Sequence, residues 1–269
     1  MLNYLQHTHS QQRANLRDHS GLSQANTKQR IICNSIEQAK GKTKAMHAVI
    51  FAGGTVRSGK AVTESIAKAE LVLACDSGAL SALRYGCTPA IVVGDFDSLT
   101  MPLSELEARG CRIVRVPAEK NETDSELAIQ VALEQGATLI TLLGALGGAR
   151  IDHTLANILL LAGFASVPIR IVDGPSCCWL LRGPGRTTVQ GQPGDLLSLL
   201  PLTAEASGVC TSELYYPLFD ETLYFGNPRG MSNVLQKEQA EISLQSGLLF
   251  VSHTSLEELK EQEAGHEGI

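Results

Sequence analysis

The chain has 269 residues and a formal net charge of −6, with 43% hydrophobic and 19% charged residues. This composition is typical of a globular protein, and the negative charge argues against nucleic-acid binding through a broad basic face. The sequence contains no bilayer-length apolar run and no signal-peptide pattern, so we expect a cytoplasmic protein that binds neither nucleic acid nor a membrane. Its seven cysteines form no CxxC pair and are expected to be reduced core residues.

Residues 1–45 differ in composition from the rest of the chain. They are rich in Gln, Asn, Ser, Thr and His and have almost no periodic apolar pattern. Such a segment cannot bury enough surface to offset its ordering entropy. We therefore expect residues 1–45 to be disordered or an over-extended N-terminal segment, with Met46 as the natural start.

Residues 46–173 alternate between short apolar runs and helical patterns. Because the apolar runs are nearly continuous, they predict a mostly parallel, Rossmann-like α/β sheet with helices on both faces. Gly86 and Gly136 fall where helix C-caps are expected, and Thr123 and Glu126 have capping-box spacing. The strands are expected at 48–52, 71–75, 90–93, 112–116, 138–143 and 169–172, and the helices at 59–69, 77–85, 101–109, 124–135 and 153–165.

Residues 174–254 have a different pattern, in which Gly- and Pro-containing turns separate short apolar segments. Regular short strands of this kind predict a smaller all-β sandwich domain. Residues 255–269 are expected to form an acidic C-terminal tail or a frayed helix. The strands of the second domain are expected at 178–182, 187–190, 195–200, 207–211, 221–225, 240–244 and 248–253.

Five aspartates follow predicted strands of the α/β domain: Asp76, Asp95, Asp97, Asp124 and Asp152. The carboxyl ends of parallel strands face one crevice, where like charges raise one another's pKa values unless a cation neutralises them. A hard divalent ion with oxygen ligands fits such a site. We expect Asp76, Asp95, Asp97 and Asp124 to bind Mg²⁺, although helix capping by Asp76 or Ser77 is an equally good interpretation of that segment.

Candidate phosphate-binding residues surround these acids. Lys120 and Thr123 precede a helix N-terminus, which favours anions. Backbone N–H groups at Gly147 and Gly148 can close around a phosphate, and Arg150 can bind it through two hydrogen bonds. A tight turn explains the glycines equally well, and His153 is a better candidate for capping or packing than for a base. The expected nucleotide-binding residues are Lys120, Thr123, Gly147, Gly148, Arg150 and Asp152.

Together these segments resemble the thiamine pyrophosphokinase family over residues 48–251. The resemblance rests on Asp76-Ser77-Gly78, Gly94-Asp95-Phe96-Asp97-Ser98, Thr123-Asp124, the segment from Gly147 to His153, and Ser232-Asn233. It implies an α/β nucleotide domain, a β-sandwich domain and a homodimer with active sites at the subunit interface. It also implies Mg²⁺ and the conversion of ATP and thiamine to thiamine diphosphate and AMP.

The resemblance also implies residue roles. Asp97, Asp124 and Arg150 would be catalytic, with either aspartate accepting the thiamine hydroxyl proton. Ser232 and Asn233 would bind thiamine, and Tyr215, Tyr216 and Phe225 are candidates for its aromatic contact.

The chain departs from the family pattern at two positions. Asn121 stands where the family commonly has Asp, and Glu213 stands where it has Gly. Glu213 therefore puts the backbone of that turn in question.

Three alternatives stay open from the sequence. A related pyrophosphokinase for another hydroxyalkyl heterocycle, such as a pterin, would share the nucleotide half. A Mg²⁺-dependent nucleotide phosphohydrolase would use the same acids, and a non-catalytic sensor of nucleotide or thiamine diphosphate would bind without turnover.

Overall fold

The computed structural model describes residues 45–266. Residues 1–44 lie outside this range. The structure therefore does not test the expectation that residues 1–45 are disordered or over-extended, with Met46 as the natural start. Within the described range, no helix combines the length and apolar character needed to cross a membrane.

The central element is a ten-stranded sheet with the order β12 (Gly230–Val234), β9 (Leu196–Pro201), β14 (Leu248–Thr254), β7 (Ser176–Arg182), β6, β5, β1, β2, β3 and β4. The strands β1 to β6 pair in parallel, which confirms the predicted parallel sheet. Their carboxyl ends therefore lie along one edge, where the site is expected. These strands are β1 (His47–Phe51), β2 (Leu71–Cys75), β3 (Ile91–Gly94), β4 (Arg112–Arg115), β5 (Leu139–Leu143) and β6 (Ile169–Asp173).

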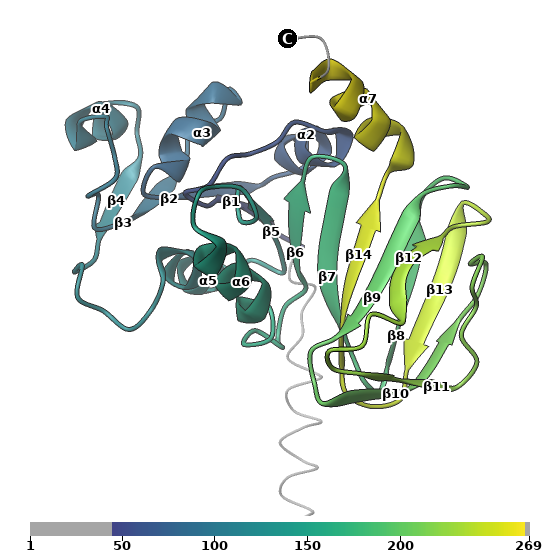
Figure 1. Ribbon diagram of the computed structural model, residues 1–269. Coiled ribbons are helices and arrows are strands. Elements are labelled where there is room, and N and C mark those ends of the chain that lie inside the picture. The colour runs from purple at the N-terminus through teal and green to yellow at the C-terminus, as the bar shows by residue number, and fades with distance from the viewer. Residues whose placement is uncertain (1–44, 267–269) are drawn as a thin grey trace, which may run out of the picture. The chain divides into compact units, whose positions relative to one another are not determined.

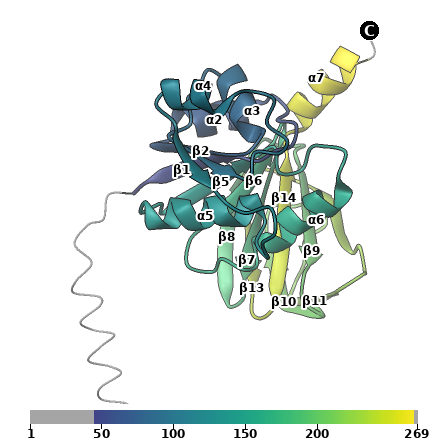
Figure 2. The same cartoon turned by 90° about the vertical axis from the view of Figure 1, so that its left-hand side faces the viewer.

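Helices cover both faces of this parallel part (Figures 1 and 2). One face packs against α2 (Lys60–Ala67), α3 (Gly78–Arg84) and α4 (Leu103–Ala108). The other face packs against α5 (Asp124–Glu134) and α6 (Ile151–Leu160). Successive strand side chains point to opposite faces, so Ile50 joins the core beneath α5 and α6 while Phe51 joins the core beneath α2, α3 and α4.

The β-rich part continues the same sheet and adds a second one. At the Asp173–Ser176 turn, β7 pairs antiparallel with β6, and β14, β9 and β12 extend the sheet from there. A four-stranded sheet with the order β11-β10-β13-β8 packs on this extension through a core that includes Leu199, Val251 and Ile242. These strands are β7 (Ser176–Arg182), β8 (Gly185–Gln190), β9 (Leu196–Pro201), β10 (Glu205–Thr211), β11 (Glu221–Tyr224), β12 (Gly230–Val234), β13 (Gln239–Leu244) and β14 (Leu248–Thr254).

The chain after β14 forms the helix α7 (Leu256–His266). The division expected near residue 173 coincides with the change from parallel to antiparallel pairing in one continuous sheet. The two-domain division therefore stays a proposal about how the chain is organised.

Local sequence signals for helix ends are confirmed. The Thr123 side chain accepts a 3.2 Å hydrogen bond from the Glu126 N–H at the start of α5. Gly86 and Gly136 follow α3 and α5 with φ of 74° and 92°, the left-handed geometry that glycine permits.

Two differences from the prediction exceed the shifts of one or two residues found at the ends of the other elements. Helix α6 begins at Ile151, two residues earlier than expected, and ends at Leu160. Strand β12 was not predicted, because Gly230 and two polar residues give it no apolar alternation. This segment is therefore a strand because it pairs with β9, not because of its own composition.

Candidate active site

A cavity of about 570 Å³ opens at the carboxyl ends of the parallel strands. It includes most of the residues selected from the sequence: Asp76, Asp95, Asp97, Lys120, Thr123, Asp124, Gly147, Gly148 and Arg150. Asp152, Ser232 and Asn233 are absent from its lining. The cavity therefore unites the proposed metal and phosphate residues but not the proposed thiamine residues.

Three carboxylates lie together in this cavity. Ligand oxygens of Asp76, Asp95 and Asp97 are all within 4.8 Å of one another. Because β2 and β3 are parallel neighbours, the residues that follow them meet at the same edge. The N–H of Asp76 donates a 2.9 Å hydrogen bond to Val93, and its φ of 46° turns the chain sharply out of β2.

The environment of Asp76 favours a cation. One carboxylate oxygen accepts a 2.8 Å hydrogen bond from the Ser98 hydroxyl, while the other is buried and unbonded within residues 45–266. Burial, together with the charges of Asp124 and Asp95, raises the pKa of Asp76. An oxygen-only donor set around a buried carboxylate oxygen fits a hard divalent ion.

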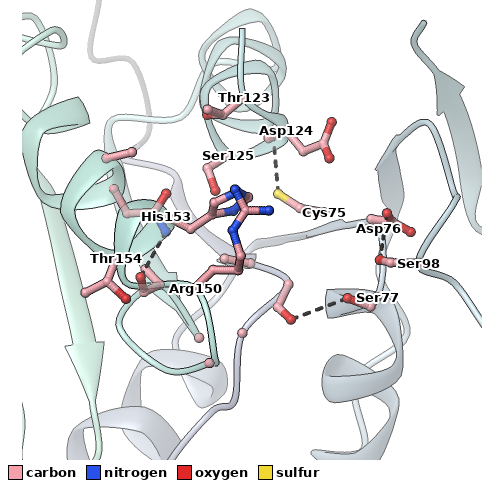
Figure 3. Close-up of a pocket in the computed structure, with 18 of the residues that line it drawn as sticks. Cys75, Asp76, Ser77, Ser98, Thr123, Asp124, Ser125, Arg150, His153 and Thr154 are labelled. Atoms are coloured by element: carbon pink, nitrogen blue, oxygen red, sulfur yellow. Dashed lines mark hydrogen bonds between the residues drawn. The ribbon is translucent and has the colours of Figure 1, made fainter. Parts of the chain in front are cut away.

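The alternative capping role in this segment is not seen. The N-cap of α3 is Ser77, whose side chain makes no capping hydrogen bond. Its hydroxyl instead donates to the carbonyl of Gly53 at 3.3 Å. The carboxylate of Asp76 is thus left to the cavity, and Ser77 connects α3 to the loop after β1 (Figure 3).

The N-terminus of α5 forms another wall of the cavity. Asp124 occupies its first turn, and Lys120 forms a 3.0 Å ion pair with it. The thiol of Cys75 donates to the backbone carbonyl of Asp124 at 3.4 Å, which ties the end of β2 to this helix. Asp124 is not one of the three clustered carboxylates, but it faces the same cavity (Figure 3).

Two glycine segments meet backbone to backbone beside the cavity. The N–H of Gly54 donates to the carbonyl of Gly144 at 3.1 Å. A Cβ atom on Gly54 would overlap the carbonyl oxygens of Gly144 and Gly147, so only glycine allows this approach. The loop after β1 is therefore part of the site.

Arg150 precedes α6 and is the N-cap of that helix. Its Nε and Nη2 atoms donate to the Asp152 carboxylate at 3.0 and 2.5 Å. Hydrogen bonding from Arg150 lowers the pKa of the Asp152 carboxyl. Asp152 is exposed and does not line the cavity. It contacts Arg150, which does line the cavity.

Helix α6 adds residues that sequence reasoning missed. Thr154 and Asn157 line the cavity, and their side chains donate to the carbonyls of Leu146 and Ala145 at 3.3 and 2.9 Å. Their i, i+3 spacing on the helix that follows Arg150 was the available signal. They hold the 144–148 loop against α6.

The residues proposed for thiamine lie on β12. The Asn233 side chain is 6% exposed, accepts from the Tyr216 N–H at 3.0 Å and donates to the Tyr216 carbonyl at 2.7 Å. This asparagine therefore braces the Tyr215–Tyr216 segment. Ser232 is exposed on the same strand, with a φ of 53°.

Glu213, which stands where the family has Gly, has a backbone conformation typical of glycine. Glu213 has a φ of 57°, in the left-handed region. Its carboxylate forms a 2.9 Å ion pair with Lys237, and its carbonyl accepts from the Gln236 N–H at 2.9 Å. The turn is therefore formed despite the substitution.

The comparisons with known proteins agree with this arrangement. The catalytic domain of thiamin pyrophosphokinase matches residues 62–172, and the vitamin B1 binding domain of the same enzyme matches residues 186–249. Thiamine pyrophosphokinase of Bacillus subtilis is 29% identical over 67% of this chain and 86% of its own length. Thiamine pyrophosphokinase 1 of Oryza sativa is 25% identical over 62% of this chain and 66% of its own length.

Solved structures show the same fold. The structure of the Bacillus subtilis thiamine pyrophosphokinase has a TM-score of 0.68 and 26% identity, covering 78% of this chain and 99% of that one. The Candida albicans thiamin pyrophosphokinase, at 17% identity and a TM-score of 0.66 over 79% of this chain and 90% of that one, supports the fold alone. With both domain models matched in order along one chain, this protein belongs to the thiamin pyrophosphokinase family.

Proposed function

We propose that this chain is a thiamine diphosphokinase, which transfers the pyrophosphoryl group of ATP to thiamine and releases AMP. The observation that supports it is one 570 Å³ cavity holding the carboxylate cluster, the α5 N-terminus and the glycine loops. Carboxylates for a cation beside anion-binding backbone are the combination that nucleotide phosphates require.

The clustered carboxylates of Asp76, Asp95 and Asp97 would hold Mg²⁺, with Asp124 approaching from α5. When bound, the ion would neutralise phosphate charge and polarise the phosphoryl oxygens. The chain's own cations act on the same charge, since Lys120 and Arg150 also line the cavity.

The transfer itself depends on positioning and electrostatic stabilisation. The hydroxyethyl oxygen of thiamine forms a bond to the β-phosphorus of ATP as its proton passes to Asp97 or Asp124. The bond from the β-phosphorus to the bridging oxygen breaks, and that oxygen leaves with AMP. Lys120 and Arg150 stabilise the negative charge that develops on the phosphates.

We also infer a homodimer. The exposed large apolar residues of the described chain fall into two groups. Three lie one turn apart on α6, namely Ile151, Leu155 and Leu159, and the others are Tyr215, Tyr216, Phe219, Tyr224, Phe225 and Met231. Apolar clusters of this kind are typical of interfaces. Because Ser232 and Asn233 do not line the cavity of their own chain, a second copy would bring its thiamine-binding residues to it.

The test is AMP release from ATP in Mg²⁺, with and without thiamine. We expect AMP only when thiamine is present, in equal amount to thiamine diphosphate, and no AMP when EDTA removes the metal. AMP formed without thiamine would identify a phosphohydrolase. Turnover of a hydroxyalkyl pterin but not thiamine would identify a related pyrophosphokinase, and binding of both ligands without turnover would identify a sensor.

A further inference from the structure

The C-terminal helix α7 holds the loop between β1 and α2, residues 52–59. The Gln262 side chain donates a 2.7 Å hydrogen bond from Nε2 to the carbonyl of Ser58. The carboxylate of Glu258 accepts a 2.9 Å hydrogen bond from the Lys60 N–H. These contacts join residues that are 204 and 198 positions apart in the chain.

Glu258 supplies a cap that α2 lacks. The N-cap residue of α2 is Gly59, which has no side chain to satisfy the first N–H groups of the helix. The carboxylate from α7 accepts one of them, and its negative charge is favourable at a helix N-terminus. Gly59 itself packs so closely on Gly174 that a Cβ atom would overlap the Gly174 carbonyl. The position of this helix start is therefore set from outside α2.

The other end of the same loop enters the cavity. Gly53 and Gly54 line it, and Gly54 is hydrogen-bonded to Gly144 of the second glycine segment. Between the two ends, Arg57 forms an ion pair with Asp173, whose side chain is 3% exposed. Only three residues, 55–57, separate Gly54 from Ser58, so the position of Ser58 restricts where Gly54 can lie.

Both partners of this contact lie outside the matched family domains. The catalytic-domain match begins at residue 62, and the vitamin B1 binding match ends at residue 249. The loop residues up to Lys60 and the whole of α7 (Leu256–His266) fall beyond these limits. The contact between α7 and the start of α2, which are neighbours in Figure 1, therefore lies outside both matched ranges.

We propose that Glu258 and Gln262 are positioning residues for nucleotide binding, and that α7 holds the loop of residues 52–59 against the phosphate part of the cavity. The inference rests on the proposed function only in taking the ligand of this cavity to be a nucleotide. Neither residue touches the cavity, so their effect passes through the backbone of Gly53 and Gly54.

The test uses the full chain with the double substitution Glu258→Ala and Gln262→Ala. We expect the Kd of a non-hydrolysable ATP analogue with Mg²⁺ to rise about 3- to 10-fold, the loss expected when one or two hydrogen bonds no longer hold a binding loop. Hydrogen exchange in peptides that contain residues 53–63 should rise at the same time. If the chain turns thiamine over, the KM for ATP should rise while the KM for thiamine stays the same.

Two variants serve as controls. Glu258→Gln keeps an oxygen acceptor for the Lys60 N–H and should retain most of the affinity for the ATP analogue. Glu261→Ala removes an exposed carboxylate from the same helix and should change nothing.

Unchanged ATP-analogue affinity in the double variant would overturn the proposal, even if the loop exchanged faster. So would an equal loss of ATP and thiamine affinity together with a lower Tm, since that pattern indicates a general structural role. Because the analogue-binding measurement needs no turnover, it gives an answer even if thiamine proves not to be the substrate.

Discussion

The hydroxyl of Ser98 donates a 2.8 Å hydrogen bond to one carboxylate oxygen of Asp76, whose other oxygen is buried and unbonded within residues 45–266. This bond restrains one member of the cluster that Asp76 forms with Asp95 and Asp97. A buried carboxylate oxygen without a partner costs free energy, and a bound cation would remove that cost. The serine thus orients a carboxylate whose remaining oxygen is free for metal.

The metal assignment predicts the effect of Asp97→Asn. Replacing a charged oxygen ligand by an amide should lower kcat at least about 10²-fold, which is the loss typical of removing one group that stabilises charge in the transition state. Mg²⁺ should also raise the Tm of the variant less than that of the unmodified protein. Glu107→Gln removes an exposed acid from α4 and should leave both properties unchanged. Near-normal turnover of Asp97→Asn would rule out this assignment.

The backbone at Glu213 predicts an order of stabilities. At a φ of 57°, Glu213→Val should be less stable than Glu213→Gly by about 1–2 kcal/mol, because only glycine adopts this region without strain. Urea unfolding measures the difference. Ser212 does not have a positive φ, so Ser212→Gly should not be more stable than Ser212→Val. Equal stabilities of the two Glu213 variants would contradict the strain argument.

Asn233 and Ser232 should separate a structural role from a substrate role. Asn233→Ala removes a buried side chain that bonds both backbone groups of Tyr216, so the free energy of unfolding should fall by about 1–3 kcal/mol. Ser232→Ala should leave stability within about 0.5 kcal/mol and raise the KM for thiamine. Urea unfolding and steady-state kinetics test the pair, and the expectation fails if Asn233→Ala unfolds like the unmodified protein.

His47 should make stability depend on pH. Its Nε2 lies 2.8 Å from Thr141 Oγ1, a buried hydroxyl that also accepts a 2.9 Å hydrogen bond from Arg170 Nε. Burial, and then the charge of Arg170, lowers the pKa of His47. The unfolded chain therefore binds more protons below about pH 6.5, and stability falls as pH falls through that region.

The measurement is the free energy of unfolding at pH 7.5 and pH 5.5. His47→Gln should reduce the difference between the two values, since the variant has no proton to gain at this position. An unchanged difference in His47→Gln would show that other groups produce the pH dependence.

The inferred dimer predicts that Leu155→Glu yields a monomer. The side chain is 55% exposed in the single chain, in the apolar row on α6. A charge buried there without a partner should oppose association and lower activity at least about 10-fold. Analytical ultracentrifugation gives the mass, and Gln130→Glu on exposed α5 surface is the charge control. If the unmodified protein is itself a monomer at all concentrations, the dimer is wrong.

Much of the fold and site could be predicted because the signals are local. Apolar runs gave the six parallel strands, and Thr123, Gly86 and Gly136 marked helix ends through their own side chains or backbone freedom. Strand order followed from none of these, because pairing depends on contacts between distant segments. Strand β12 was missed for that reason, since its pairing with β9 rather than its composition makes it a strand.

The five strand-end aspartates mark what the sequence by itself determined: an acidic, phosphate-directed edge of a parallel sheet. Tertiary structure alone decided their separate positions. Parallel neighbours β2 and β3 bring Asp76, Asp95 and Asp97 together, whereas Asp124 pairs with Lys120. Asp152 pairs with Arg150 outside the cavity lining, because its position is set by the start of α6. The sequence specifies the side-chain types. The distances between these side chains depend on the order of the strands in the sheet and on the packing of the helices against it.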